Sequence, residues 1–473
     1  MIGEVIRLIR TKQASCVELV GRSLDLIAAA DPRLNAVVAL RADEALAEAA
    51  AQDRRLMAGE APGPLAGLPI LVKDLEDVAG MVTTQGSLIY ADTPPAPTDG
   101  TVPGRLRAAG AIVIGKTNLP ECAFEAYTDN RLYGPTRNPW DERYSPGGSS
   151  GGSAAALSAG FVAVATATDG GGSARIPAAF CGLVGLKPTN GIIGRSPIPS
   201  WIDLSTDGHM GHSVADLRTL LAITAGPVPG DPTALPVWSP APGRLSRVVA
   251  SPRTCDWGAL DPILQAAFDE ALRVLDVELG LAVECIAPSQ VTPAGNADVD
   301  WYTMCCVEQA HQIGASVLDQ RASDFDPVLL ERMLEGLATP LADYVDARRR
   351  RFDHVRHLDL LLGDDGVLVT PTLAMTAQFA DGRMLDADLP GTPEDALNTG
   401  LQNITGHPAI SVPAGLLPNG LPFGLQLTGP RFRDDLLLDL AERWETVRPW
   451  PWFAPGFEPG FEPLVPQPGR GST

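Results

Sequence analysis

Apolar and polar positions change their spacing along the chain and divide it into zones. Over residues 1–60 apolar side chains recur at helical spacing, with Ser15 suited to cap one helix and an alanine-rich second helix over residues 41–57. Over residues 61–226, short β-branched runs alternate with helical stretches and Gly/Pro turns. This alternation is typical of α/β units around a mixed or parallel sheet. We therefore expect an N-terminal helical layer (1–60) followed by a catalytic core (61–226).

The second half of the chain changes character twice. Residues 227–363 read mainly as helix after a proline-rich linker, and strand-like runs return over residues 364–448. This order predicts a mainly helical subdomain inserted into one domain, whose sheet the C-terminal segment completes. The basic run 348–351 is most simply a solvated helix face. The proline-rich tail, 449–473, is expected to lie extended against the body.

Composition narrows the class of protein. The 473 residues are 45% hydrophobic, enough for a large core, and the net charge of −21 argues against nucleic acid or an anionic membrane surface as a partner. Seven cysteines are scattered without metal-ligand spacing, which indicates neither a disulfide framework nor a zinc site and favours reduced thiols in a cytoplasm. We also expect no cofactor. No run approaches the ~20 apolar residues of a membrane span, and the N-terminus lacks a signal-peptide pattern.

Two glycine-serine clusters within residues 145–173 carry the strongest functional signal. Glycine loses much backbone freedom on folding, so such clusters are expected where the chain needs unusual dihedral angles or approaches a ligand closely. A flexible linker would be polar throughout, whereas the connector 154–166 reads as a buried helix running into a strand. In the second cluster, the three glycines 170–172 precede Ser173 and could turn several N–H groups toward one point, as in an oxyanion hole.

Two serines compete as the nucleophile. Ser149 stands in a GxSxG pattern, the nucleophile elbow of α/β-hydrolases. Such a short pattern arises easily by chance in a region so rich in Gly and Ser. No histidine stands in a setting that marks it as the partner base. The remaining candidate base is Lys73, which ends an apolar run that predicts a buried strand. Burial can lower the pKa of a lysine by several units from about 10.4.

Six sequence blocks resemble the successive motifs of the amidase signature family. They are GLPILVKD (67–74), GKTN (115–118), RNPW (137–140), GGSSGGS (147–153), TDGGGS (168–173) and CGLVGLKPT (181–189), with HPAISVP (407–413) a looser match. The resemblance implies that 1–473 form a single amidase signature domain of the α/β class, with a central mixed sheet flanked by helices.

The resemblance also implies a Ser-cisSer-Lys triad. By motif position Ser173 is the nucleophile, Ser149 the bridging serine in a cis peptide and Lys73 the base, with the amides of Gly170, Gly171, Gly172 and Ser173 around the oxyanion. One departure is Gly170, where the family commonly has a bulkier residue, which would loosen this loop.

The implied activity is hydrolysis of carbon–nitrogen amide bonds through an acyl-enzyme. The blocks look most similar to those of aryl acylamidases and of hydrolases of the 6-aminohexanoate cyclic-dimer type. We expect a small uncharged amide or carbamate (urethane) as substrate, and a homodimer is common in the family. The alternative is a glutaminase resembling the A subunit of tRNA-dependent amidotransferases, but that subunit usually has Arg-Gln-Pro where this chain has RIP (175–177).

Two further expectations concern ligands. Family pockets are lined by the segment here at 122–128, and Trp301, Met304, Cys305 and Leu401 are further candidates, although core packing is at least as common for each. GAIVIGKT (110–117) fits the Walker A expression, but its inner residues are strand formers, whereas a phosphate cradle is a loop after a strand. Nucleotide binding is therefore not expected.

Overall fold

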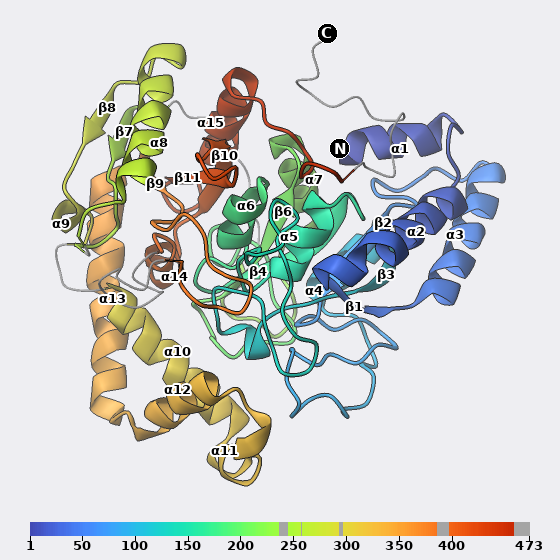
Figure 1. Cartoon of the computed structure of the whole chain (residues 1–473), viewed down its shortest axis with the longest axis horizontal. Helices are drawn as coiled ribbons and strands as arrows, with labels where there is room; N and C mark the ends of the chain where they lie inside the picture. The colour runs from blue at the N-terminus through green and yellow to red at the C-terminus, as the bar shows by residue number, and fades with distance from the viewer. Residues whose placement is uncertain (236–244, 257, 293–296, 386–396, 458–473) are drawn as a thin grey trace.

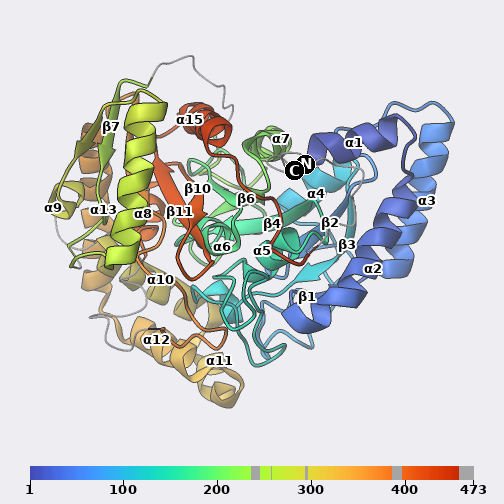
Figure 2. The ribbon, with the colours of Figure 1, turned by 45° about the horizontal axis from the view of Figure 1, so that its top comes forward.

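The computed structural model describes residues 1–235, 245–256, 258–292, 297–385 and 397–457. Its centre is a mixed sheet that crosses the molecule, with helices on both sides (Figure 1, Figure 2). Within the described residues the sheet has eleven strands in the order β1-β3-β2-β4-β6-β5-β10-β11-β9-β7-β8. This is the mixed sheet flanked by helices that the sequence predicts.

The strands are β1 (Val37–Leu40), β2 (Pro69–Lys73), β3 (Ile112–Thr117), β4 (Val164–Asp169), β5 (Val184–Lys187), β6 (Thr206–Gly211), β7 (Arg247–Ala250), β8 (Val283–Cys285), β9 (Gly366–Pro371), β10 (Ala409–Leu416) and β11 (Pro422–Thr428).

The α-helices are α1 (Ile2–Arg10), α2 (Cys16–Leu34), α3 (Ala42–Met57), α4 (Thr101–Ala108), α5 (Gly151–Ser158), α6 (Arg175–Cys181), α7 (Val214–Thr224), α8 (Pro262–Arg273), α9 (Pro288–Val291), α10 (Ala297–Ile313), α11 (Ala315–Gln320), α12 (Pro327–Ala338), α13 (Leu341–Leu362), α14 (Gly400–Thr405) and α15 (Asp434–Val447).

Strands β2 and β4 bring the chemically important segments together. They run parallel, with Ile70 opposite Val164, so their carboxyl ends meet at one edge of the sheet. Lys73 ends β2, and Asp169 ends β4 immediately before the glycine loop. The structure therefore places the candidate base and the loop of Ser173 next to each other.

The N-terminal helices α1 to α3 lie at one end of the sheet, beside β1 and β3 (Figure 1). The Ser15 hydroxyl accepts a hydrogen bond from the Glu18 N–H, and the Glu18 carboxylate accepts one from the Ser15 N–H. This reciprocal capping box confirms the helix start predicted at Ser15.

The segment 227–363 is not helical throughout, because β7 and β8 extend the central sheet beside β9. Helices α10 to α13 form a separate layer with their own apolar cluster, which includes Met304, Cys305 and Leu358. They lie at the end of the molecule away from α1 to α3 (Figure 2). The proline-rich linker predicted at 227–243 contains no helix or strand over residues 227–235, and its remainder lies outside the described residues.

The basic run in α13 differs from its predicted role as a solvated face. Arg348 and Arg351 both pair with Asp203, and Arg350 pairs with Asp300, whereas Arg349 is largely exposed. The helical period explains the difference, because consecutive arginines point to different sides. Arg348, Arg350 and Arg351 reach acidic residues outside α13, whereas among the described residues Arg349 reaches only Asp346 of its own helix. The run therefore fastens α13 to the body of the protein.

The chain after α15 packs against the body as far as it is described. Trp450 is buried and donates its indole N–H to the His212 carbonyl, and Phe453 is buried beside it. The rest of the predicted tail, 458–473, lies outside the described residues.

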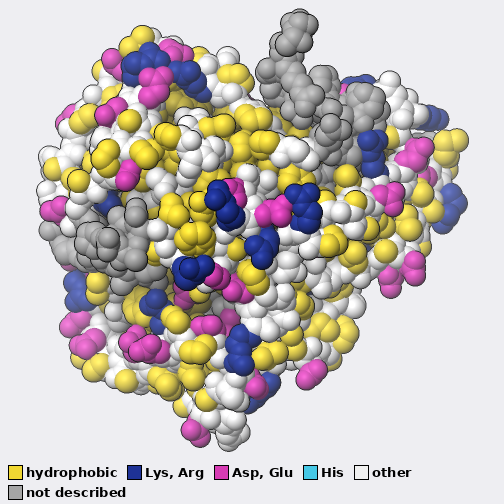
Figure 3. Space-filling view, viewed as in Figure 1, with side chains coloured by type: hydrophobic (Ala, Val, Ile, Leu, Met, Phe, Trp, Pro, Cys, Tyr) yellow, Lys and Arg dark blue, Asp and Glu magenta, His cyan; other side chains and the backbone are white. Residues whose placement is uncertain are grey.

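On the face shown in Figure 3, acidic and basic side chains are interspersed among apolar ones. Across the described part of the chain, no helix combines the length and apolar character that crossing a membrane requires.

Candidate active site

Lys73 is buried completely, and its amine contacts two hydroxyl groups. Its Nζ lies 2.8 Å from Ser149 Oγ and 2.8 Å from Thr168 Oγ1, and is hydrogen-bonded to both. The backbone holds the strand end in place, because the Lys73 N–H donates to Thr166 Oγ1 at 2.9 Å. Residues from β2, β4 and the start of α5 thus converge on one amine.

The pKa of Lys73 is lowered from 10.5 to about 7. Burial is the main cause, since it removes the hydration that stabilises the ammonium form. The carboxylates of Glu76, Asp169 and Asp207 act in the opposite direction. A substantial fraction of the amine is therefore neutral near pH 7, as a general base requires.

Ser149 precedes α5, and its side chain is almost fully buried beside Lys73. The Gly148–Ser149 peptide bond is cis, the feature that the resemblance attaches to this serine. Gly148 is crowded by backbone, since a Cβ there would lie 2.7 Å from the Glu125 carbonyl oxygen and 2.7 Å from the Tyr127 nitrogen. Only glycine fits this approach.

Ser173 follows the glycine loop and lines the same cavity as Ser149 and Thr168. Between the two described serines there is no direct hydrogen bond, so the proton step between them remains a prediction. The Gly172 N–H donates to Asp169 Oδ1 at 2.9 Å and is not free to face an oxyanion. The N–H groups of Gly170, Gly171 and Ser173 have no acceptor among the described residues.

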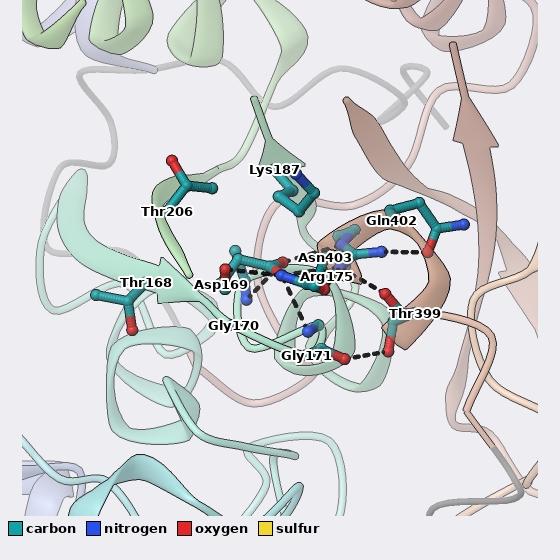
Figure 4. A network of polar contacts seen from close by, with 12 residues as sticks. Thr168, Asp169, Gly170, Gly171, Arg175, Lys187, Thr206, Thr399, Gln402 and Asn403 are labelled. Atoms are coloured by element: carbon teal, nitrogen blue, oxygen red, sulfur yellow. Dashed lines mark hydrogen bonds and ion pairs between the residues drawn. The ribbon is translucent and has the colours of Figure 1, made fainter. Parts of the chain in front are cut away.

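A buried ion pair fixes this loop (Figure 4). Burial would raise the pKa of Asp169, but Arg175, 2.8 Å away, holds that pKa below its usual value of 3.8. The Arg175 guanidinium also donates to the Thr399 carbonyl and to Asn403 Oδ1. Gly171 is held from the other side, where its carbonyl accepts a hydrogen bond from Thr399 Oγ1 at 2.6 Å.

The rings of two tryptophans pack against the glycine loop. A Cβ at Gly170 would lie 2.5 Å from the Trp201 ring, and a Cβ at Gly171 would lie 2.5 Å from the Trp301 ring. Trp301 also donates its indole N–H to the Gly170 carbonyl at 2.7 Å. The unusual glycine at position 170 therefore does not leave space in the loop, because the Trp201 ring occupies it.

The nucleophile-elbow alternative receives no support from the histidines. His407 is buried and lies 3.2 Å from Asp359, and His209 bonds the Thr224 hydroxyl. Among the described residues, no histidine contacts either serine. Lys73 is the ionisable group that touches Ser149.

The Walker A match is a strand, β3, as its residues predict. Lys116 is buried, with Nζ 3.0 Å from Asp74 Oδ1 and 2.9 Å from the Val82 carbonyl oxygen. Its amine is occupied by the protein and is not presented to a phosphate.

Two cavities meet at Ser173. The first, of about 200 Å³, is lined by both serines and by polar side chains that include Glu76 and Asp207. The second, of about 70 Å³, shares Ser173 and is walled by aromatic rings, those of Phe124, Trp201, Trp301 and Tyr302.

The predicted lining residues divide between cavity and core. Cys122 lines the first cavity and Trp301 the second, whereas Met304, Cys305 and Leu401 pack in the apolar cluster of the helical layer. Sequence reasoning missed other residues of the site. Thr168 precedes the glycine loop and carried a signal in its position, but Trp201 and Asp207 carried none.

No group of three or more metal-binding side chains gathers within the described ranges.

Comparisons with known proteins identify the family of this chain. The profile of the family described as Amidase matches residues 18–438. The chain is 38% identical over 466 residues to the A subunit of the glutamyl-tRNA(Gln) amidotransferase of Synechococcus sp. (strain CC9605), covering 92% of this chain and 94% of that protein. It is 35% identical over 445 residues to an acylamidase of Rhodococcus erythropolis, covering 92% of each. A solved bacterial aryl acylamidase of the amidase signature enzymes superposes with a TM-score of 0.87 and 30% identity, covering 95% of this chain and 96% of that one.

Proposed function

The chain belongs to the amidase family and is a hydrolase of carbon–nitrogen amide bonds; from this premise we propose that it cleaves small amides through an acyl-enzyme on Ser173. Lys73 serves as the base and Ser149 carries protons between the two. The observation that carries the proposal is the fully buried Lys73 amine, 2.8 Å from Ser149 Oγ, in the cavity that Ser173 lines.

During acylation protons pass first from Ser173 through Ser149 to Lys73, and then from Lys73 through Ser149 to the leaving nitrogen. Neutral Lys73 takes the hydroxyl proton of Ser149, which takes that of Ser173 as its Oγ attacks the carbonyl carbon. The N–H groups of Gly170, Gly171 and Ser173 are placed to stabilise the oxyanion. As the C–N bond breaks, Ser149 donates its proton to the leaving nitrogen and recovers one from Lys73. Water then attacks the carbonyl carbon of the ester, and Ser149 and Lys73 take up one proton of that water and deliver it to Ser173 Oγ as the bond from Ser173 to the acyl group breaks.

A panel of amides, carbamates and esters tests this function. We expect the wild type to hydrolyse amides, and Ser173→Ala to lose about 10⁴-fold or more in kcat/KM. Ser158→Ala is the matched control, because Ser158 is a buried serine whose hydroxyl donates to the Cys181 carbonyl and which lines neither cavity. Activity that survives in Ser173→Ala but not in Ser149→Ala would favour the nucleophile-elbow alternative instead. The panel also decides whether carbamates are substrates.

The second candidate function is that of an amidotransferase A subunit, favoured by the 38% identity to one such protein. Ile176 stands against it, since that subunit usually carries glutamine there. Ile176 lines the aromatic cavity, where an apolar side chain favours an apolar group. Gel filtration combined with activity assays distinguishes the two candidate functions. We expect a free-standing amidase, a cytoplasmic homodimer, which is fully active without a partner. A chain that hydrolyses only glutamine, and weakly, would belong to a larger complex.

A further inference from the structure

Ser173 lies where the two cavities meet, and this inference rests on the proposed function of that serine. Ser149 lines the first cavity and is absent from the lining of the second. In the proposed reaction Ser149 protonates the leaving nitrogen, so the amine part of the substrate must lie on the Ser149 side. The acyl part then extends into the second cavity.

The second cavity is an aromatic box. Phe124 packs edge-on against Trp201 with ring centroids 5.6 Å apart, and Trp201 packs edge-on against Trp301 at 5.5 Å. Tyr302 completes the box, 6.4 Å from Phe124. Such rings bury flat apolar groups well and add edge-to-face contacts.

The two carboxylates beside the aromatic box are already engaged. Glu125 lies 3.6 Å from Arg332, whose guanidinium also stacks over the Phe124 and Tyr302 rings. Asp298 accepts a hydrogen bond from the Cys255 thiol. Neither is offered to a ligand as a free charge, so the box favours an apolar acyl group.

The first cavity contains a carboxylate without such a partner. Asp207 stands opposite Thr168 in the antiparallel β4–β6 pair, so its side chain lies on the same face as the Lys73 contact. Its carboxylate makes no hydrogen bond or ion pair to any described residue, and it is only partly accessible, from the cavity. Burial raises its pKa to about 6, which leaves it ionised at pH 8.

The cations near Asp207 are committed elsewhere. Arg195 donates to the Ser205 and Ile202 carbonyls, and Arg105 donates to the carbonyls of Gly226 and Pro227. Glu76, which lines the same cavity, accepts a hydrogen bond from Thr166 through Oε2, whereas its buried Oε1 has no hydrogen-bond partner among the described residues. Burial raises the pKa of Glu76 to about 8, so Asp207 is the more fully ionised of the two carboxyl groups at pH 8. A substrate group that donates a hydrogen bond is therefore the partner that Asp207 lacks.

We propose that the aromatic box takes the acyl group and the first cavity the amine, so that the preferred substrate is an amide of an aromatic acid with a small hydroxyl- or ammonium-bearing amine. This refines the expectation of a wholly uncharged substrate. The aryl group belongs on the carbonyl side of the scissile bond, not on its nitrogen.

Two amides with the ring on opposite sides of the scissile bond test this orientation at pH 8. N-(2-hydroxyethyl)benzamide carries the ring on the acyl side, and acetanilide carries it on the amine side. We expect kcat/KM to be at least about tenfold higher for the benzamide, although aniline is intrinsically the better leaving group. Equal or faster hydrolysis of acetanilide would overturn the orientation.

A variant tests the aromatic box. Phe124→Leu keeps an apolar side chain but removes a ring, and it should lower the kcat/KM ratio of N-(2-hydroxyethyl)benzamide to N-(2-hydroxyethyl)acetamide about threefold to tenfold. The matched control is Phe268→Leu, a buried phenylalanine of the main core outside both cavities, which should leave the ratio unchanged. Equal ratios in the two variants would contradict the role of the box.

A second variant tests the amine side. The wild type should prefer N-(2-hydroxyethyl)benzamide over the isosteric N-propylbenzamide, and Asp207→Asn should reduce that preference about tenfold, since a hydrogen bond to a charged acceptor is lost. An unchanged preference would contradict the part given to Asp207.

The proposed function and the assignment of the two cavities are contradicted by different results. If the wild type hydrolyses no amide, or if Ser173→Ala retains activity, the proposed function is wrong. If amides are hydrolysed on Ser173 with the opposite orientation, only the assignment of the cavities is wrong.

Discussion

At the scale of single residues, the burial of Lys73 has a cost to folding, and in the proposed reaction the same burial makes its amine a base. Its shift from 10.5 to about 7 corresponds to about 5 kcal/mol between the two protonation states. Below pH 7 the amine is protonated in the folded and the unfolded chain, so the cost of burying the ammonium is fully present. Between pH 7 and 10.5 the unfolded chain binds more protons, so this group's contribution to stability rises with pH.

Lys73→Met should therefore abolish hydrolysis and stabilise the protein. At pH 6 we expect the free energy of unfolding to rise by at least about 1 kcal/mol, after allowance for the lost hydrogen bonds to Ser149 and Thr168. The gain over wild type should shrink as the pH rises toward 10.5. Chemical denaturation at pH 6 and pH 9 measures this, and a variant less stable than wild type at pH 6 would contradict a buried, desolvated ammonium.

Trp301 is predicted to act as a positioning residue for the glycine loop. Trp301→Phe keeps a ring in the cavity but removes the hydrogen bond to the Gly170 carbonyl, so kcat should fall about tenfold with a smaller change in KM. Trp201→Phe is the comparison, because the Trp201 indole nitrogen is buried without a hydrogen-bond partner among the described residues. Equal kcat losses in the two variants would show that the hydrogen bond is unimportant.

Residue types and motif positions were enough to identify Lys73, Ser149 and Ser173 as candidates. They could not identify Trp201 or Asp207, which reach the cavity from a loop and a strand distant in sequence. An isolated aromatic or acidic residue is common on any chain, and only the fold shows that these two face Ser173.

At the scale of elements, close packing constrains helix α5. A Cβ at Gly152 would lie 2.5 Å from the Asn118 nitrogen and 2.7 Å from the Ala36 carbonyl oxygen, all backbone atoms that cannot move aside. Gly152→Ala should therefore destabilise the protein by more than about 2 kcal/mol, although alanine favours helix formation.

Gly21 in α2 provides the matched control, since nothing lies within 4 Å of a Cβ there. Gly21→Ala should stabilise by about 0.5–1 kcal/mol through helix propensity alone. Thermal unfolding of both variants tests the pair, and a Gly152→Ala protein as stable as Gly21→Ala would contradict the packing of α5.

Local patterns predicted the elements that are decided locally. The cap at Ser15 and the strand at 112–117 follow from neighbouring residues. The prediction that the basic run 348–351 forms a solvated helix face was wrong for Arg348 and Arg351, which pair with Asp203. Strands β7 and β8 were not predicted within 227–363. In both cases the deciding partners, Asp203 and strand β9, lie far away along the chain.

At the scale of the whole molecule, Arg175 joins the two halves of the chain. Its guanidinium binds Asp169 in the first half and Thr399, Gln402 and Asn403 in the second (Figure 4). The glycine loop before Ser173 is thereby tied to Thr399 and to helix α14, so the C-terminal segment helps to hold this loop in place.

Arg175→Met should destabilise the protein by about 3–5 kcal/mol, because it leaves the Asp169 carboxylate buried without its counterion. Arg349→Met is the matched control, because Arg349 is largely exposed and its one ion pair among the described residues, to Asp346 at 3.7 Å, is also exposed to solvent. Its free energy of unfolding should therefore change by no more than about 0.5 kcal/mol. Denaturant titrations measure both. A mild effect at Arg175 would mean that the network does not hold the two halves together.

Fluorophosphonate labelling tests most directly whether Ser173 is the nucleophile and Lys73 its base. The labelling rate is measured between pH 5.5 and 9, and the modified residue is mapped by mass spectrometry. We predict a single label on Ser173, formed at a rate that rises with pH as Lys73, whose pKa is about 7, loses its proton. A label on Ser149, or a labelling rate that does not change across this range, would contradict this prediction.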